Sequence, residues 1–337
     1  MSSKGNGRGV EWTELYEALK NYYYSYDKQT RKLFDLFYDS VRFFSPEAVT
    51  NGIPLCIGIS KRNGRYEIIL PTHIYEQLLM FIEQSIPNIP PFDSKLLAQN
   101  EYEIVERFEA NTSKVFSRYY QKVKTKNRQM ERLQAAKREA SQAKELLASK
   151  TNIFVSIDIE AYELQHSILL EIGWSMYDSK TGLFMDQHYI NDQYRHLKNS
   201  RFVDDQKEHF NFGISVWCSL DQALVELRKD LDWAVERDGE FILVGHGLDS
   251  DLKYLAQQKF HWPDGYGGET LEVNKSACKI ILNTDNIYAA SINDLHNPPS
   301  LGGTLNILGV DTWNLHNAGN DAHYTLLLLM KLAGNFS

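Results

Sequence analysis

Four carboxylates and one histidine in the second half of the chain have the residue types and spacing of a metal-dependent hydrolytic site. Asp158 and Glu160 stand two residues apart in the run VSIDIEAYE at 155–163, which has the pattern of a strand. Residues at i and i+2 of a strand share a face, so the two carboxylates are expected side by side. Two neighbouring carboxylates repel each other unless a cation lies between them, and we therefore expect a divalent metal there.

A third carboxylate and a histidine–aspartate pair follow along the chain. Asp251 comes after the apolar run 241–244 and the turn 245–247, where a buried strand is expected to pass into a helix. His316 precedes a strongly apolar segment, and Asp321 lies five residues later. Five residues of one helix turn through about 500°, so we place His316 in the preceding loop and Asp321 in the first helical turn. Both side chains can then face one site.

Each of these features also has a purely structural explanation. An Asp-x-Glu pair on a strand is often a solvated edge, and Asp251 can be a helix N-terminal charge that the dipole favours. A histidine before a helix is frequently a hydrogen-bonding residue of the loop. The order of all five residues along one chain is what favours a shared site.

This order, which closes with His-x-Ala-x-x-Asp at 316–321, resembles that of the DEDDh family of 3′–5′ exonucleases, which have a ribonuclease H-like fold. Flanking segments are similar as well. Residues 168–178, with Glu171-Ile172-Gly173, resemble the second strand of that fold, and residues 184–190 resemble the third. Residues 300–310 resemble the short helix before the last motif, with Ser300 as N-cap and Leu305 and Leu308 on its buried face.

Within that family, the first motif and residues 208–217 most resemble a fungal group whose founding members are known through a DEAD-box helicase of mRNA export. The resemblance covers about residues 150–335. It implies an α/β domain with a ribonuclease H-like mixed sheet flanked by helices. It also implies a partner that is single-stranded nucleic acid, RNA slightly favoured over DNA, and an RNA-processing or mRNA-export protein as a further partner.

The resemblance also implies roles for individual residues. Two Mg²⁺ or Mn²⁺ ions would be held by four carboxylates, and His316 would act as the general base that accepts a proton from the attacking water. Tyr324 lies too far into the helix to take that role. Ile159 and Ala161 are expected near the terminal nucleotide, which would leave as a nucleoside 5′-monophosphate. The metal-binding carboxylates are Asp158, Glu160, Asp251 and Asp321.

Two other classes of protein remain open. A nuclease fold that has lost most or all of its activity could serve as a scaffold that binds RNA or an mRNA-export or processing partner. A different hydrolase or transferase with an aspartate-rich metal site is the weaker rival, because it would not explain His316 together with Asp321.

Composition sets wider limits. The chain has 337 residues, 43% of them hydrophobic, which is enough for one large domain or two modest ones, and we favour two. We find neither an apolar run of about 18 residues nor a secretory signal, so we expect no membrane association. Three scattered cysteines without Cys-x-x-Cys spacing favour a reducing compartment and argue against a structural zinc site. We therefore expect an intracellular protein of the cytoplasm, the nucleus or both.

Residues 121–150 carry nine basic and three acidic side chains, although the whole chain has a formal net charge of −8. The segment lacks Gly and Pro and is expected to be a helix of about 45 Å. Its weak heptad pattern does not support a stable coiled coil, so we expect a long solvated connector, with packing on one side as a further possibility. A role in contacting phosphates, with Lys137 and Arg138 as candidates, is weighed equally with a linker that has no ligand. The heptad positions are Leu133, Ala136, Ala140, Ala143 and Leu147.

The first third of the chain points to structure more than to function. We expect residues 1–10 to be a disordered tail, residues 11–120 a small α+β domain of unknown role, and residues 151–337 the exonuclease-like domain. Within the α+β domain, helices are predicted at 11–24, 31–43 and 73–86, and strands at 53–59 and 65–71 form a hairpin across Asn63-Gly64. The tyrosine-rich run 22–26 is expected to serve packing rather than base stacking.

Overall fold

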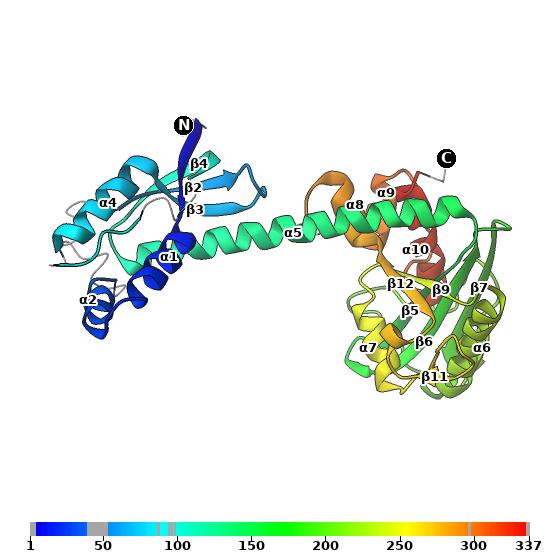
Figure 1. Ribbon diagram of the computed structural model, residues 1–337. Helices are drawn as coiled ribbons and strands as arrows, with labels where there is room; N and C mark the ends of the chain where they lie inside the picture. The colour runs from blue at the N-terminus through cyan, green and yellow to red at the C-terminus, as the bar shows by residue number, and fades with distance from the viewer. Residues whose placement is uncertain are drawn as a thin grey trace. The chain divides into compact units, whose positions relative to one another are not determined.

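A computed structural model describes residues 5–38, 53–85, 88–93, 97, 99–295 and 298–334 (Figure 1). The chain divides into two compact units, Met1–Glu131 and Arg132–Ser337. The division falls inside the longest helix, α5 (Ser113–Ser149), so each end of that helix belongs to a different unit. Within the described ranges, no helix is both long enough and apolar enough to cross a membrane.

The first unit is built on four antiparallel strands that close on themselves in the order β1-β3-β2-β4. Leu15, Leu19 and Ile82 of its helices pack with Leu55 and Ile57 of β2 in one buried cluster. The elements are β1 (Gly5–Glu11), α1 (Trp12–Tyr24), α2 (Lys28–Tyr38), β2 (Ile53–Ser60), β3 (Tyr66–Pro71), α4 (Thr72–Ser85) and β4 (Asn100–Ala110).

The predicted helices and the predicted hairpin of this unit are present. Gly64 has a φ of +71°, as the turn between β2 and β3 requires. Tyr23 is fully buried and Tyr22 packs edge-on against Phe92, which agrees with a packing role for the tyrosine-rich run. The last residues of two predicted helices, 39–43 and 86, lie outside the described residues.

The predicted disordered tail is wrong for residues 5–10, which form most of β1. This strand pairs with β3 and with β4 and so closes the sheet. A Cβ atom at Gly9 would lie 2.5 Å from Ile69 Cγ2 and from the Leu70 carbonyl oxygen, so glycine permits the close pairing. The tail prediction failed because a polar, glycine-rich segment shows no pattern of its own, and its partners are distant in sequence.

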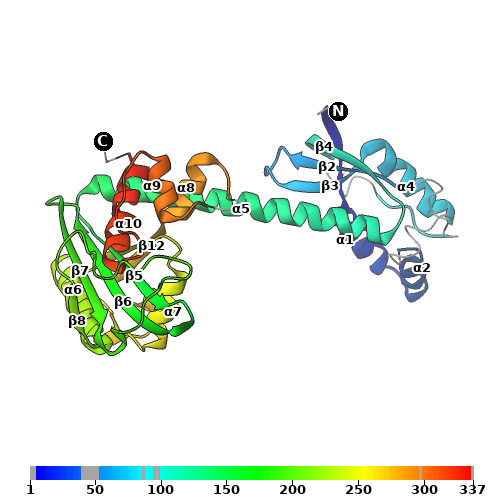
Figure 2. The same ribbon diagram turned by 180° about the vertical axis from the view of Figure 1, so that it is seen from behind.

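The second unit contains a mixed sheet of six strands in the order β12-β9-β5-β6-β7-β8 (Figure 2). β5 pairs antiparallel with β6 and parallel with β9, and β6 pairs antiparallel with β7. The predicted mixed sheet with flanking helices is confirmed. The strands are β5 (Ile153–Tyr162), β6 (Gln165–Asp178), β7 (Leu183–Asn191), β8 (Val216–Cys218), β9 (Phe241–Gly245) and β12 (Cys278–Asn283), and a separate pair is formed by β10 (Trp262–Pro263) and β11 (Glu269–Thr270).

Helices cover the two faces of this sheet, and the alternation of side chains along β5 decides which residue meets which helix. Ile153, Val155 and Ile157 pack in one cluster with α6, whereas Phe154 packs in another cluster with α10. Even-numbered residues of β5 therefore face α10. The helices are α6 (Leu220–Asp238), α7 (Asp249–Gln257), α8 (Thr284–Ile292), α9 (Leu301–Ile307) and α10 (Ala318–Leu332), with short 3₁₀ turns at Asp192–Tyr194 and Val273–Lys275.

The predicted basic helix is present, and from residue 132 onward it packs on one side against the second unit and is not a wholly solvated connector. Ala143 and Leu147 are buried against Phe154 and Ile242 of the sheet, and this part of α5 belongs to the second unit. Glu139 accepts hydrogen bonds from the backbone N–H of Asn283 and from the side chain of Asn286. The weak heptad positions are thus the packed face of a helix that completes the domain.

Candidate active site

Asp158 and Glu160 are the two carboxylates that β5 turns toward α10. Ile157 and Ile159 point into the opposite cluster with α6, so the carboxylates at 158 and 160 share the other face. Asp158 lies opposite Gly173 of β6. The predicted side-by-side placement of the acidic pair on one strand face agrees with this register.

The N-terminus of α10 reaches this face because two glycines let the helix approach the sheet. A Cβ atom at Gly173 would lie 2.2 Å from the backbone nitrogen of Gly319. A Cβ atom at Gly319 would lie 2.8 Å from His188 Cβ. Asn317 is the N-cap and accepts from the backbone N–H of Asn320 at 3.1 Å. Asp321 falls in the first turn, as predicted.

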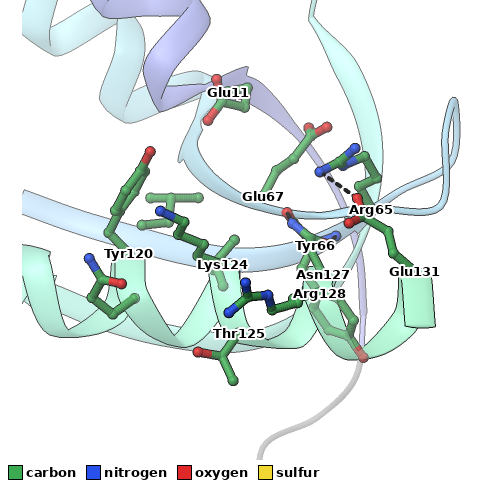
Figure 3. A pocket seen from close by; sticks show the side chains of 13 residues that line it. Glu11, Arg65, Tyr66, Glu67, Tyr120, Lys124, Thr125, Asn127, Arg128 and Glu131 are labelled. Carbon is green, nitrogen blue, oxygen red and sulfur yellow. Dashed lines mark hydrogen bonds and ion pairs between the residues drawn. The ribbon is translucent and has the colours of Figure 1, made fainter. Parts of the chain in front are cut away.

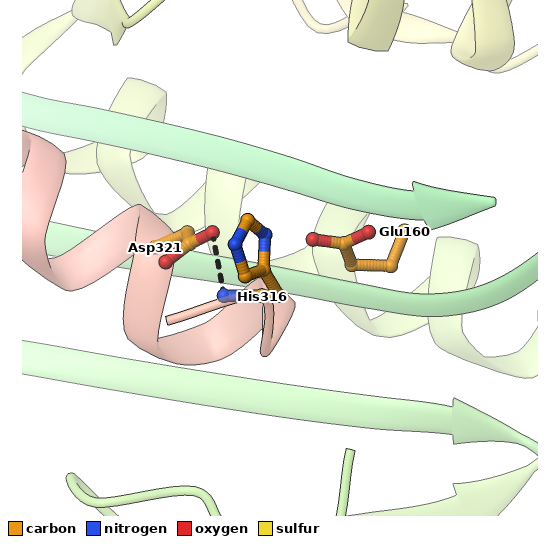
Figure 4. Close-up of side chains that lie close together, drawn as sticks. All are labelled: Glu160, His316 and Asp321. Atoms are coloured by element: carbon orange, nitrogen blue, oxygen red, sulfur yellow. Dashed lines mark hydrogen bonds between the residues drawn. The ribbon is translucent and has the colours of Figure 1, made fainter. Parts of the chain in front are cut away.

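His316, Glu160 and Asp321 converge. One ligand-type atom from each lies within 4.8 Å of the other two, and Figure 4 shows the imidazole between the two carboxylates. The backbone N–H of His316 donates to Asp321 Oδ2 at 3.1 Å, which ties the loop to the first helical turn. His316 is exposed and has a φ of +66°, a backbone conformation uncommon for a residue other than glycine. Its predicted place in the loop before α10 is confirmed.

Asp251 joins the group from a different element. It lies in the first turn of α7, which follows β9 after a short turn, as predicted. Its Oδ1 accepts the backbone N–H of Ile159 at 3.0 Å, and that bond fixes the carboxylate beside the strand that carries Asp158 and Glu160.

The carboxylates of the cluster all have raised pKa values, chiefly because they are buried. Burial, followed by the charges of Asp251 and Asp321, raises the pKa of Asp158 well above its usual range. Burial and neighbouring carboxylates do the same to the pKa of Glu160. Burial raises the pKa of Asp251 and that of Asp321 to about 7. The protein has thus assembled negative charges that destabilise one another.

This donor set fits a divalent cation. Asp158 Oδ2 and Asp321 Oδ1 are buried and accept no hydrogen bond within the described part of the chain. Buried acceptors without donors are costly unless a cation or water satisfies them. Carboxylate oxygens are the ligands that Mg²⁺ and Mn²⁺ prefer.

A buried pair to which the sequence alone assigns no role lies beside this cluster. Glu171 of β6 accepts from the backbone N–H of Ala318 at 3.3 Å, and its Oε2 lies 2.9 Å from His188 Nε2. Burial raises the pKa of Glu171 to about 8 and lowers that of His188 to about 4, so a protonated carboxyl faces a neutral imidazole at neutral pH. The signal in the sequence was a glutamate inside the apolar run of residues 168–176.

The four predicted nucleic-acid contacts lie in different surroundings. Ile159 is 7% exposed and its side chain packs in the core. It contributes to the site through its backbone N–H, which donates to Asp251 Oδ1. Ala161 is half-buried at the end of β5. Lys137 and Arg138 are exposed on α5.

A hollow of about 650 Å³ lies in the first unit beside β3 and the first half of α5 (Figure 3). Lys124 and Arg128 line it, and neither has an ion-pair partner among the described residues. Glu11 and Glu67 line it as well, and Asn127 ties α5 to the backbone of β3. Because cations and carboxylates are balanced, the lining selects neither an anion nor a cation.

Comparisons with known proteins agree with the geometry of the second unit. Residues 153–332 match the family DEDDh_C, described as the DNA polymerase III subunit epsilon-like, C-terminal domain. The chain is 31% identical over 206 residues to an uncharacterized protein of Saccharomyces cerevisiae, covering 56% of this chain and 42% of that protein. It is equally identical to the Good for full DBP5 activity protein 2 of the same yeast, over 55% of this chain and 36% of that protein.

An uncharacterized nucleolar protein of Schizosaccharomyces pombe is 30% identical over 209 residues, which cover 60% of this chain and 77% of that protein. The chain therefore spans less than half of the length of the two S. cerevisiae relatives.

Proposed function

This chain belongs to the family of DEDDh exonuclease-like domains, and we propose that its second unit is a metal-dependent 3′–5′ exonuclease that acts on single-stranded RNA or DNA. The observation that carries the proposal is the convergence of His316 with the carboxylates of Glu160 and Asp321, next to Asp158 and Asp251. Structural carboxylates are seldom buried together, because each raises the cost of ionising the others.

In the proposed reaction, Asp158, Glu160, Asp251 and Asp321 hold the metal. Two bound Mg²⁺ or Mn²⁺ ions would activate a water molecule and stabilise the departing 3′-oxygen. The carboxylates are kept in place by bonds within the chain, since Ile159 donates to Asp251 and His316 donates to Asp321.

His316 is the proposed general base. An imidazole is the side chain most often used to accept a proton from an attacking nucleophile near neutral pH. Its exposed ring beside Glu160 and Asp321 leaves it open to a water molecule at the site. Water would attack the terminal phosphodiester, the bond from phosphorus to the 3′-oxygen would break, and a nucleoside 5′-monophosphate would leave.

The substrate is single-stranded RNA or DNA, with RNA slightly favoured. Ala161, at the end of the strand that carries Glu160, is a proposed contact of the terminal nucleotide, and Lys137 and Arg138 are proposed contacts of phosphates.

The alternative is a nuclease-fold scaffold that binds RNA or a partner from RNA processing or mRNA export, because one relative is named for full DBP5 activity. We propose an intracellular location, and one relative is described as nucleolar.

The test is an assay on matched RNA and DNA single strands labelled at the 5′ end, with Mn²⁺, Mg²⁺ or EDTA. The proposal predicts a ladder of strands shortened from the 3′ end with either metal and none with EDTA. Asp158→Asn should remove the activity, whereas Asp249→Asn, an exposed aspartate on α7, should retain it. Binding of RNA without shortening under any condition would favour the scaffold.

A further inference from the structure

A second hollow, of about 480 Å³, adjoins His316 in the second unit. It is lined by loop residues that include Arg201, Phe202 and Gln206 on one side and Asn314 with His316 on the other. Its volume is within the roughly 300–1,000 Å³ of sites that hold small ligands. Because His316 contributes to the wall, whatever fills the hollow lies next to the carboxylate cluster.

The side chains at its rim suit a base and a phosphate. Phe202 is 71% exposed, so most of its apolar surface is in contact with water and would gain from being covered. The guanidinium of Arg201 lies 5.2 Å from the centre of that ring. An exposed aromatic face beside a cation is the pairing that single-strand binding proteins use to stack a base and contact its backbone.

The loop that carries these side chains is hydrogen-bonded to the end of β5, the strand that carries Asp158 and Glu160. Glu163 accepts the backbone N–H groups of Ser200, Arg201 and Phe202 at 2.9–3.3 Å. Asn199 adds two bonds, to the carbonyl of Ala161 and from the N–H of Glu163, at 3.0 and 2.9 Å. Since Glu163 follows Glu160 by three residues, these bonds fix Phe202 relative to a proposed metal ligand.

The other end of the loop is bound to the helix that carries Asp321. Asn317, the N-cap of α10, donates to the carbonyl oxygens of Gln206 and Lys207 at 3.0 and 3.3 Å. Lys207 is itself buried and pairs with Asp205 at 3.3 Å. Both ends of the segment are thus attached to elements of the proposed active site, and the backbone that carries the exposed ring is held in place.

We propose that this hollow is a stacking subsite for one of the last nucleotides at the 3′ end of a single strand, with Phe202 stacked on its base and Arg201 beside its phosphate. The assignment rests on the proposed exonuclease function. The lining contains one cation, Arg201, and one carboxylate, Asp204, so stacking contributes more than charge.

The test pairs a change in the protein with a change in the substrate. Strands that carry one abasic nucleotide, moved stepwise inward from the 3′ end, are hydrolysed by the wild-type protein and by Phe202→Ala. At one position the abasic strand should cost the wild type roughly 5–150-fold in kcat/KM, the usual worth of one stacked base. Phe202→Ala should be slower by a similar factor on the intact strand and indifferent to the abasic nucleotide there.

Tyr266→Ala is the matched control, because this ring is 97% exposed and lies in the loop before β11. It should behave like the wild type on every strand. Glu163→Ala should lose the discrimination although Phe202 is present, since its loop is no longer held. Equal hydrolysis of all strands by wild type and Phe202→Ala would overturn the subsite and leave the exonuclease intact.

Binding without catalysis separates the two proposals. In EDTA, fluorescence anisotropy with the same strands should show weaker binding by Phe202→Ala than by Tyr266→Ala. If no strand is shortened with any metal but this difference is found, the exonuclease proposal fails and the stacking site stands. Equal affinities of the two variants would refute the stacking site.

Discussion

Replacing Asp251 with asparagine should stabilise the metal-free protein above neutral pH. Asparagine keeps the Oδ1 acceptor for the backbone N–H of Ile159 but removes one charge from the carboxylate cluster. Burial raises the pKa of Asp251 to about 7, so between pH 4 and 7 the folded state binds a proton that the unfolded state has released. Stability is therefore lost as the pH rises through that window.

The size of the gain follows from the same pKa. Raising the pKa of a carboxyl from about 4 to about 7 corresponds to about 4 kcal/mol once the group is ionised. Burial causes this shift, and the neutral amide of asparagine is also costly to bury, so only part of that free energy is recovered. We expect Asp251→Asn to raise the free energy of unfolding by about 2 kcal/mol at pH 8, or about 4–8 °C in Tm.

Urea unfolding in EDTA, followed by tryptophan fluorescence at several pH values, measures this difference. Five of the six tryptophans lie in the second unit, at positions 174, 217, 233, 262 and 313. The gain should be near zero at pH 4, grow up to about pH 7 and then stay constant. Saturating Mn²⁺ should reverse the order of stability, because the wild type gains binding free energy that the variant lacks.

Asp249→Asn is the control, since it removes the same charge from an exposed position in the same helical turn. If it stabilises the metal-free protein as much as Asp251→Asn does, then net charge rather than the buried cluster explains the gain. A gain that does not depend on pH would show that ionisation of Asp251 is not its cause.

Three further outcomes are expected. Asp158→Ala or Asp321→Ala should abolish release of mononucleotides from a labelled strand, with an unchanged circular dichroism spectrum; a fully active variant would exclude the site. His316→Ala should slow hydrolysis near neutral pH by roughly 10²–10⁴-fold and retain Mn²⁺ binding by calorimetry. Loss of Mn²⁺ binding would instead make His316 a ligand. Lys137→Glu combined with Arg138→Glu should weaken the binding of long strands and flatten its salt dependence by about 0.7 in log–log slope for each phosphate that the helix no longer binds. An unchanged slope would leave α5 a packing helix only.

Features that depend on nearby residues could be predicted from the sequence. The alternation along residues 155–163 predicted a strand with both carboxylates on one face, and the helical periodicity after His316 placed Asp321 in a first turn. Ser300 caps α9 and accepts from the N–H of Gly303 at 3.3 Å, in agreement with the predicted N-cap. Each of these follows from local geometry alone.

Features that depend on distant partners could not be predicted. Gly9 lies in a strand only because β3 and β4 flank it, and Glu171 is held by His188 and by the start of α10. The bonds from the loop at 200–202 to Glu163 join residues 37–39 positions apart. Periodicity within a segment carries no information about such pairs. The same holds for α5. Its positive charge could be predicted from its own residues, but the packing of its weak heptad positions depends on sheet residues such as Phe154 and Ile242.

The most direct test of the exonuclease is to identify its product in ¹⁸O-labelled water. A 3′-hydroxyl RNA strand is incubated with Mn²⁺, and the small products are analysed by mass spectrometry. Attack of water on the terminal phosphorus predicts nucleoside 5′-monophosphates that each carry one ¹⁸O atom on the phosphate, with none formed by Asp158→Ala. Release of 3′-monophosphates, or of no mononucleotide from RNA or from a matched DNA strand, would contradict the account.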